Sequence, residues 1–113
     1  ILFDPEKLST RSTKLLNNAE EVYVSAASLW ELAIKYNQGK LQYQPKFLEE
    51  GIDKLNLLHL EIKLSHVLAL EDISLPHNDP FDKMLVAQAE AEGMQLLTAD
   101  KILIASGYRI LAN

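Results

Sequence analysis

The chain has 113 residues, the size of one domain that can build a single hydrophobic core. Its 48% apolar and 24% charged residues are typical of a soluble globular protein, and no apolar run approaches the roughly 20 residues of a membrane-spanning helix. The net charge of −5 argues against indiscriminate nucleic-acid binding, which needs clustered Lys and Arg, but not against a nuclease with an acidic, metal-holding site.

The first half of the chain predicts two helices around one short strand. Residues 4–20 are expected to form a helix that an Asp-Pro pair opens. Residues 21–26 (EVYVSA) combine β-branched and aromatic side chains and predict a strand. Residues 28–38 predict a helix that stops at Gly39, a residue suited to the position after a helix.

The second half alternates between short helices and short strands. The expected elements are a helix over 46–55, an ambiguous strand over 57–62, a helix over 65–72, a longer helix over 80–92, a strand over 94–99 (MQLLTA), helical turns over 100–106 (DKILIAS) and a strand over 108–112 (YRILA). This alternation predicts an α/β sandwich with a mostly parallel sheet, although it does not give the strand order.

Three carboxylates share one kind of location, where a strand ends or a helix begins. Glu31 is expected in the first turn of the helix after VYVSA, Asp82 in the first turn of the helix after the LPHN loop, and Asp100 directly after QLLTA. The carboxyl ends of strands form the ligand crevice of open α/β sheets, so these acids could converge. Convergent carboxylates suit Mg²⁺ or Mn²⁺, which activate water and stabilise an in-line phosphoryl displacement.

Each acid also has a structural interpretation, and the spacing alone does not choose between the two. The sequence SLWE matches a capping box that would place Glu31 at the third helical position, and Glu31 could instead pair with Lys35. Asp79 is a natural helix cap ahead of a proline, which leaves Asp82 as a favourable charge at the positive helix end. Asp100 could cap the helix that follows it.

The helix that carries Glu31 is expected to be largely buried. Apolar residues surround nearly its whole circumference: Leu29, Trp30, Leu32, Ala33, Ile34 and Tyr36. A carboxylate near the start of a buried helix is costly unless it is paired or bound to metal. Trp30 and Tyr36 could also stack on nucleic-acid bases, although such residues more commonly belong to a core or an interface.

Three segments together resemble the PIN-domain family, in particular the VapC-like toxins of bacterial toxin–antitoxin pairs: VSAASLWELAIKYNQGKL, HNDPFDKMLVAQA and LLTAD. The similarity covers nearly the entire chain, and the segments occur in the family's order. The resemblance implies a single PIN-like domain over residues 1–113, folded as a three-layer α/β/α sandwich with a mostly parallel sheet. It also implies a Mg²⁺- or Mn²⁺-dependent endoribonuclease that uses a cluster of acids.

The resemblance assigns roles to particular residues. Glu31, Asp82 and Asp100 are implied to be the catalytic, metal-binding acids. Ser25 matches a small polar position that the family often keeps beside its site. His77 lies five residues before Asp82 in the same loop and is a candidate for contact with substrate.

One feature departs from the family pattern. The family begins with a central strand of the type LLDTH, whose aspartate is the first metal ligand. This chain begins with ILFDPEKLS and no methionine, and we expect it to start after that strand, with Asp4 opening the first helix rather than binding metal. The domain is therefore expected to be N-terminally incomplete, lacking a central strand and the hydrogen bonds and packing that it would provide.

These observations favour a VapC-like metal-dependent endoribonuclease. The implied partners are an RNA substrate, a cognate VapB-like antitoxin and a second copy of the chain, with no membrane. The main alternative is a catalytically inactive, truncated PIN-like module that binds an antitoxin or another protein, and a third is a different acid-cluster phosphotransferase. A cytoplasmic location fits the absence of cysteine and of a signal peptide. The sequence has no Ser-His-Asp ordering, and four glycines leave no phosphate-cradling loop.

Overall fold

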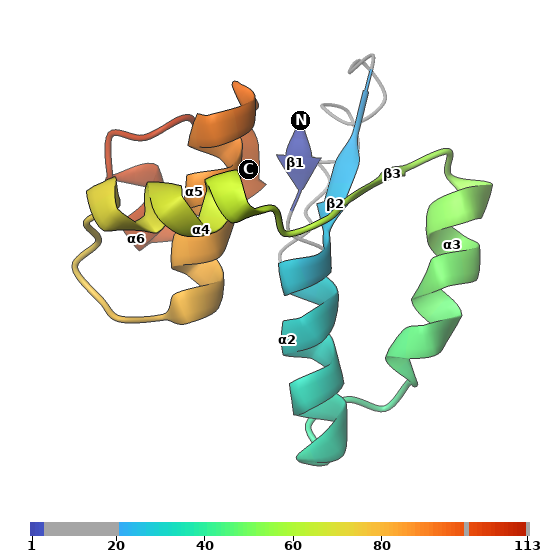
Figure 1. Ribbon diagram of the computed structural model, residues 1–113. Coiled ribbons are helices and arrows are strands. Elements are labelled where there is room, and N and C mark those ends of the chain that lie inside the picture. Colours follow the sequence, from blue (N-terminus) through green and yellow to red (C-terminus); the bar gives the residue numbers. More distant parts are fainter. Residues whose placement is uncertain (4–20, 99, 113) are drawn as a thin grey trace.

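The computed structural model describes residues 1–3, 21–98 and 100–112. Five short parallel strands form one sheet in the order β3-β2-β1-β4-β5 (Figure 1). The strands are β1 (Leu2–Phe3), β2 (Tyr23–Ser25), β3 (Leu58–Leu60), β4 (Leu96–Thr98) and β5 (Ile110–Ala112). The predicted parallel sheet is therefore confirmed.

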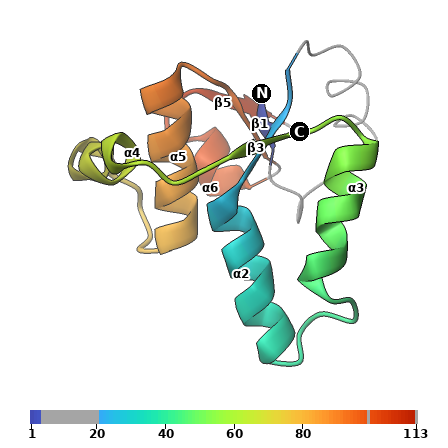
Figure 2. The same ribbon diagram turned by 45° about the vertical axis from the view of Figure 1, so that its right-hand side comes forward.

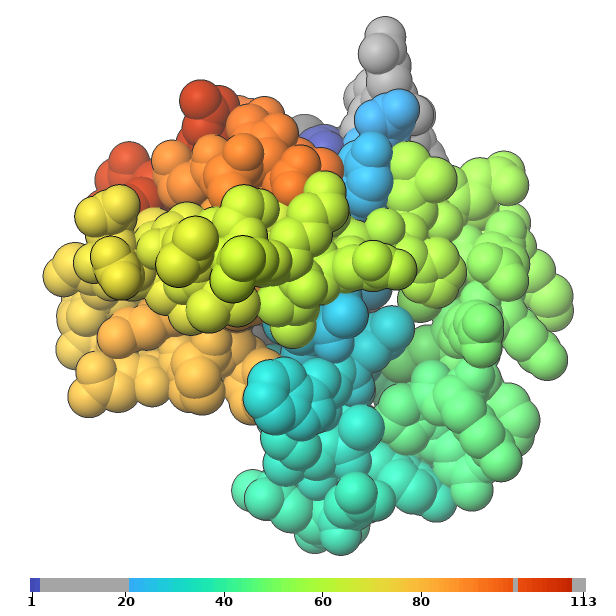
Figure 3. Space-filling view, in the orientation of Figure 1, coloured from blue at the N-terminus to red at the C-terminus, as the bar shows by residue number. Residues whose placement is uncertain are grey.

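The helices that accompany the sheet follow the predicted alternation. They are α2 (Ala26–Asn37), α3 (Leu48–Lys54), α4 (Leu64–Ala69), α5 (Pro80–Glu92) and α6 (Lys101–Ile104), with 3₁₀ turns η1 (Pro45–Phe47) and η2 (Leu70–Asp72). Helix α5 packs against α4 and α2. Helix α2 extends away from the sheet, and α3 runs back toward β3 (Figures 1 and 2). In the space-filling view, α4 crosses the front of the molecule above α2 (Figure 3). In the part of the chain that the structure describes, no helix has the length and apolar character needed to cross a bilayer.

Apolar side chains pack on both faces of the sheet because neighbouring residues of a strand point to opposite sides. Leu96 of β4 belongs to a core cluster with Leu85 and Val86 of α5. The next residue, Leu97, belongs to a second cluster with Ile52 of α3. These two clusters place helices on both sides of the strands, as an α/β sandwich requires.

The centre of the sheet is occupied by β1. Leu2 is fully buried, its N–H donates to the carbonyl of Gln95 (2.9 Å), and the Tyr23 N–H donates to the carbonyl of Ile1 (2.7 Å). The prediction that this sheet lacks a central strand is therefore wrong. The apolar ILF segment can fill the position because a strand buried on both faces needs only a short apolar run. Asp4 and the helix predicted over 4–20 lie outside the described residues.

Several predicted boundaries shift in the structure. The helix predicted from residue 28 begins at Ala26, because Ser25 caps it. The segments predicted as the single helices 46–55 and 65–72 each combine a 3₁₀ turn with a short α-helix. The ambiguous strand over 57–62 is a strand, β3. The helix over 80–92 is confirmed.

Candidate functional site

The carboxyl ends of β2, β1 and β4 lie next to one another because these strands are parallel neighbours. Ser25 ends β2 and Thr98 ends β4, and both side chains are fully buried. Asp100 follows β4 after one further residue. Open α/β sheets bind their ligands at this edge, so the candidate site consists of the residues at and after these strand ends.

Asp79 caps α5, as predicted. Its Oδ1 accepts the backbone N–H groups of Phe81 (2.9 Å) and Asp82 (3.2 Å), and Pro80 takes the first helical position. Asp82 is therefore in the first turn of α5 without being the residue that caps it. Its side chain is buried, with the residue 7% exposed, which is unusual for a carboxylate.

His77 lies against Asp82. Its Nδ1 accepts the Asp79 N–H (3.2 Å), so the proton of the neutral ring is on Nε2. Nε2 lies 3.2 Å from Asp82 Oδ2, which is ion-pair distance, although the angle is not that of a hydrogen bond. The structure thus brings together two residues that the sequence placed in one loop.

Glu31 lies in the second turn of α2 and not in the first. The Ala27 N–H donates to Ser25 Oγ (3.0 Å), so the helix starts three residues earlier than the SLWE capping box requires. The capping-box interpretation of Glu31 is wrong for this reason, and Ser28 is a buried residue inside the helix.

The helix turn that carries Glu31 lies beside the turn that carries Asp82. The rings of Trp30 and Phe81, each next to one of these acids in the sequence, meet edge to face with centroids 5.0 Å apart and planes at 83°. The prediction that α2 is largely buried is wrong, because Trp30 is 59% exposed and the helix extends beside α3, away from the sheet (Figure 2). Glu31 itself is partly exposed.

Asp100 caps α6. Its Oδ1 accepts the N–H groups of Ile102 (2.9 Å) and Leu103 (3.2 Å), and its own N–H donates to Thr98 Oγ1 (3.1 Å). The capping interpretation of Asp100 is therefore confirmed. Capping through Oδ1 does not exclude a role for the same residue in metal binding.

Within the described ranges 1–3, 21–98 and 100–112, no three His, Asp or Glu side chains lie close enough to hold a metal ion together. The structure pairs Asp82 with His77 and places the Glu31 turn beside the Asp82 turn. The donor chemistry fits Mg²⁺ or Mn²⁺, which prefer carboxylate oxygens. The described residues do not by themselves complete a ligand set.

A family model for the PIN domain matches residues 1–106 of the chain. The chain belongs to the PIN-domain family. This PIN domain is 27% identical over 103 residues to ribonuclease VapC22 of Mycobacterium tuberculosis, a match that covers 88% of this chain and 78% of the relative.

Solved structures of low sequence identity share the fold. The crystal structure of FitAcB from Neisseria gonorrhoeae superposes with a TM-score of 0.67 at 18% identity, covering 100% of this chain and 97% of that one. The structure of FitAB bound to an IR36 DNA fragment gives a TM-score of 0.66 at 17% identity, covering 99% and 94%. The predicted PIN-like fold is confirmed.

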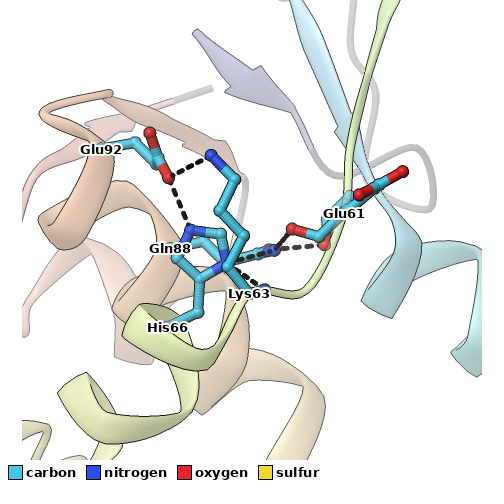
Figure 4. Close-up of polar contacts among 6 residues, drawn as sticks. Glu61, Lys63, His66, Gln88 and Glu92 are labelled. Atoms are coloured by element: carbon cyan, nitrogen blue, oxygen red, sulfur yellow. Dashed lines mark hydrogen bonds and ion pairs between the residues drawn. The ribbon is translucent and has the colours of Figure 1, made fainter.

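Sequence reasoning missed a polar contact behind the site. Ser25 is fully buried, and its hydroxyl donates to Gln88 Oε1 (2.5 Å), so this structure shows Ser25 bonded inside the protein rather than exposed to a substrate. Gln88 in turn lies beside the buried His66 (Figure 4). The two ends of the contact are 63 residues apart, and nothing in the local pattern around Gln88 marks it.

Proposed function

We propose that this PIN domain is a metal-dependent endoribonuclease in which Glu31, Asp82 and Asp100 hold Mg²⁺ or Mn²⁺. The observation that carries the proposal is the burial of Asp82 at a helix start that another residue, Asp79, already caps. A buried carboxylate beside a second titratable side chain, here His77, is typical of functional sites. Membership of the PIN family and similarity to a protein named a ribonuclease support the same reaction.

The residues of the proposed site come from separate segments of the chain and have different proposed roles. Glu31 of α2 and Asp82 of α5 lie on turns of two helices that are side by side. Asp100 follows the end of β4, the strand that pairs with β1. The bound ion would activate water and stabilise the charge on the phosphate. His77 holds its ring proton on Nε2, facing Asp82, and is the proposed contact for the substrate backbone.

The proposal extends to partners. RNA is the proposed substrate, a VapB-like antitoxin the proposed inhibitor, and a second copy of the chain the proposed companion in a homodimer, all in the cytoplasm. The similarity to ribonuclease VapC22 supports RNA as the substrate and an antitoxin as the partner. A basic binding surface is not part of the proposal, because the chain carries a net charge of −5.

A second candidate function is an inactive module that binds an antitoxin or another protein. The observation that favours it is the lack of a three-acid group among the described residues. The predicted absence of a central strand no longer supports this candidate, because β1 occupies the centre of the sheet.

The test is cleavage of a pool of single-stranded and structured RNA by the chain in Mn²⁺, in EDTA and after Asp82→Asn. Asp79→Asn is the matched control, because asparagine also caps helices and the substitution removes one carboxylate from the same turn. We expect EDTA and Asp82→Asn to abolish cleavage and Asp79→Asn to retain it. Cleavage that survives Asp82→Asn would remove the central residue of the proposal, and a folded chain that cleaves nothing would favour the binding module.

A further inference from the structure

Three fully buried polar side chains form a line from the surface of the domain to the start of α2. They are His66 of α4, Gln88 of α5 and Ser25 at the end of β2. Glu92 and Lys63 close the outer end of the line, where Glu92 Oε1 lies 2.7 Å from His66 Nε2 and 3.1 Å from Lys63 Nζ (Figure 4). Buried polar groups that bond one another in series can fix each other's orientation.

The direction of the line is set by the backbone of α4. The Lys63 N–H donates to His66 Nδ1 (3.0 Å), so this nitrogen carries no proton. The ring proton of neutral His66 is therefore on Nε2, where it donates to Glu92. The lone pair of Nδ1 is thus an acceptor shared between the Lys63 N–H and the Gln88 amide.

That acceptor and the carbonyl of Glu61 together determine how the Gln88 amide is turned. Gln88 Nε2 lies 3.3 Å from His66 Nδ1 and donates to the carbonyl of Glu61 (3.3 Å). If the amide were flipped, its oxygen would face both of these acceptors and leave buried groups without partners. Gln88 Oε1 must then face Ser25, whose hydroxyl donates to it.

The orientation of the Ser25 hydroxyl matters because it also caps α2. Since its proton points at Gln88, its lone pairs are available to accept the Ala27 N–H (3.0 Å). This cap fixes where α2 begins, and the second turn of α2 carries Glu31 beside the Asp82 turn.

We propose that His66 and Gln88 are positioning residues, which orient the Ser25 cap and so set the helix that carries Glu31. This proposal rests on the proposed nuclease function and deepens it. If these side chains only satisfied one another's hydrogen bonds in the core, the bond from His66 to Glu92 would matter as much as the others. The proposal instead requires an acceptor at residue 66 on the side facing Gln88, and not the bond to Glu92.

Two substitutions of His66 separate these requirements. His66→Asn keeps an oxygen acceptor near the position of Nδ1, whereas His66→Leu removes it, and both lose the bond to Glu92. Gln88→Met keeps the approximate volume of Gln88 and removes all three amide contacts, which provides a second variant if His66→Leu does not fold. Gln44→Met is the control, because Gln44 donates to Tyr36 on the far part of α2, outside the line.

The readouts are hydrogen exchange of the Ala27 amide, the ¹⁵N spectrum of the His66 ring, and kcat and KM for RNA cleavage in Mn²⁺. We expect His66→Leu and Gln88→Met to raise Ala27 exchange by about tenfold, as the loss of one cap bond implies. The kcat should fall with them while KM changes little. His66→Asn and Gln44→Met should stay close to the unsubstituted chain, whose ring should carry its proton on Nε2.

The proposal is overturned if His66→Asn and His66→Leu behave alike, or if stability falls while Ala27 exchange does not change. Because Ala27 exchange does not depend on catalysis, it decides the positioning proposal even if the chain cleaves no RNA. The absence of cleavage would count only against the proposed function.

Discussion

Replacing Asp79 with alanine should separate the capping acid from the proposed metal-binding acid. Asp79 Oδ1 accepts two backbone N–H groups of the first turn of α5, at 2.9 and 3.2 Å. Loss of such a cap costs about 1 kcal/mol, within a range of about 0.5–2 kcal/mol. For a domain of this size, that corresponds to a melting temperature lower by roughly 3–6 °C.

Asp82→Asn should have the opposite effects, with a small change in stability and a large loss of cleavage. Removing its charge loses a favourable helix-end interaction of about 0.3–1 kcal/mol but also removes the cost of keeping a carboxylate buried. The free energy of unfolding should therefore change by less than it does in Asp79→Ala. Cleavage should fall by at least about 100-fold, because even changes around a metal's outer shell cost about 10–100-fold.

The assay pairs thermal unfolding with Mn²⁺-dependent RNA cleavage for both variants. The reasoning requires Asp79→Ala to lower stability while retaining most of the cleavage, and Asp82→Asn to do the reverse. If both variants lose stability and cleavage together, the two carboxylates do not have separate roles, and the structural argument for Asp82 fails.

Substitutions at four further positions test other parts of the structure. Asp100→Asn should keep the cap of α6 but lose RNA cleavage, whereas Asp100→Ala should lose both. If Asp100→Asn still cleaves RNA, Asp100 is only a helix cap. The bond from His66 lowers the pKa of Glu92 below its ordinary value of 4.5, so Glu92 stabilises the fold above that pH and loses this effect as pH falls through the lowered pKa. The free energy of unfolding of Glu92→Gln, measured in urea, should not show this loss at acid pH. A pH profile identical to that of the unsubstituted chain would contradict the assignment. Gly93→Ala should destabilise by about 1 kcal/mol because Gly93 has a φ of +66°, while Gly51→Ala, inside α3 with nothing within 4 Å of a new Cβ, should stabilise by about 0.5–1 kcal/mol. Thermal unfolding of the two glycine variants measures the difference, and shifts of the same sign would refute it.

Features with strong local signals could be predicted from the sequence. Helix α5 has an aspartate cap, a proline at its first position and a glycine after its last turn, and its bounds match the prediction. Each of these signals acts within one turn of the residue that carries it, so no tertiary information is needed. The parallel α/β arrangement followed from alternation for the same reason.

The start of α2 could not be predicted in this way. Ser25 and Ser28 both offer a side chain that can cap a helix, and the SLWE pattern favours Ser28. The structure selects Ser25, whose hydroxyl also bonds to Gln88, 63 residues away in the sequence. A contact between distant segments therefore decides a local boundary, and the same shift moves Glu31 from the first turn to the second.

Capping and metal binding are compatible roles for the acids of this domain. A cluster of carboxylates is mutually repulsive until a cation arrives, and the start of a helix lowers this cost because its N–H groups and dipole favour negative charge. Asp79 and Asp100 bond directly to such N–H groups, and Asp82 lies in the first turn of α5. A carboxylate is therefore favourable at the start of a helix whether or not it also binds metal, which explains why the sequence pattern alone could not choose between a cap and a ligand. The choice depends on whether the rest of each carboxylate faces a shared site, and neutral Asn substitutions test this because they preserve the caps.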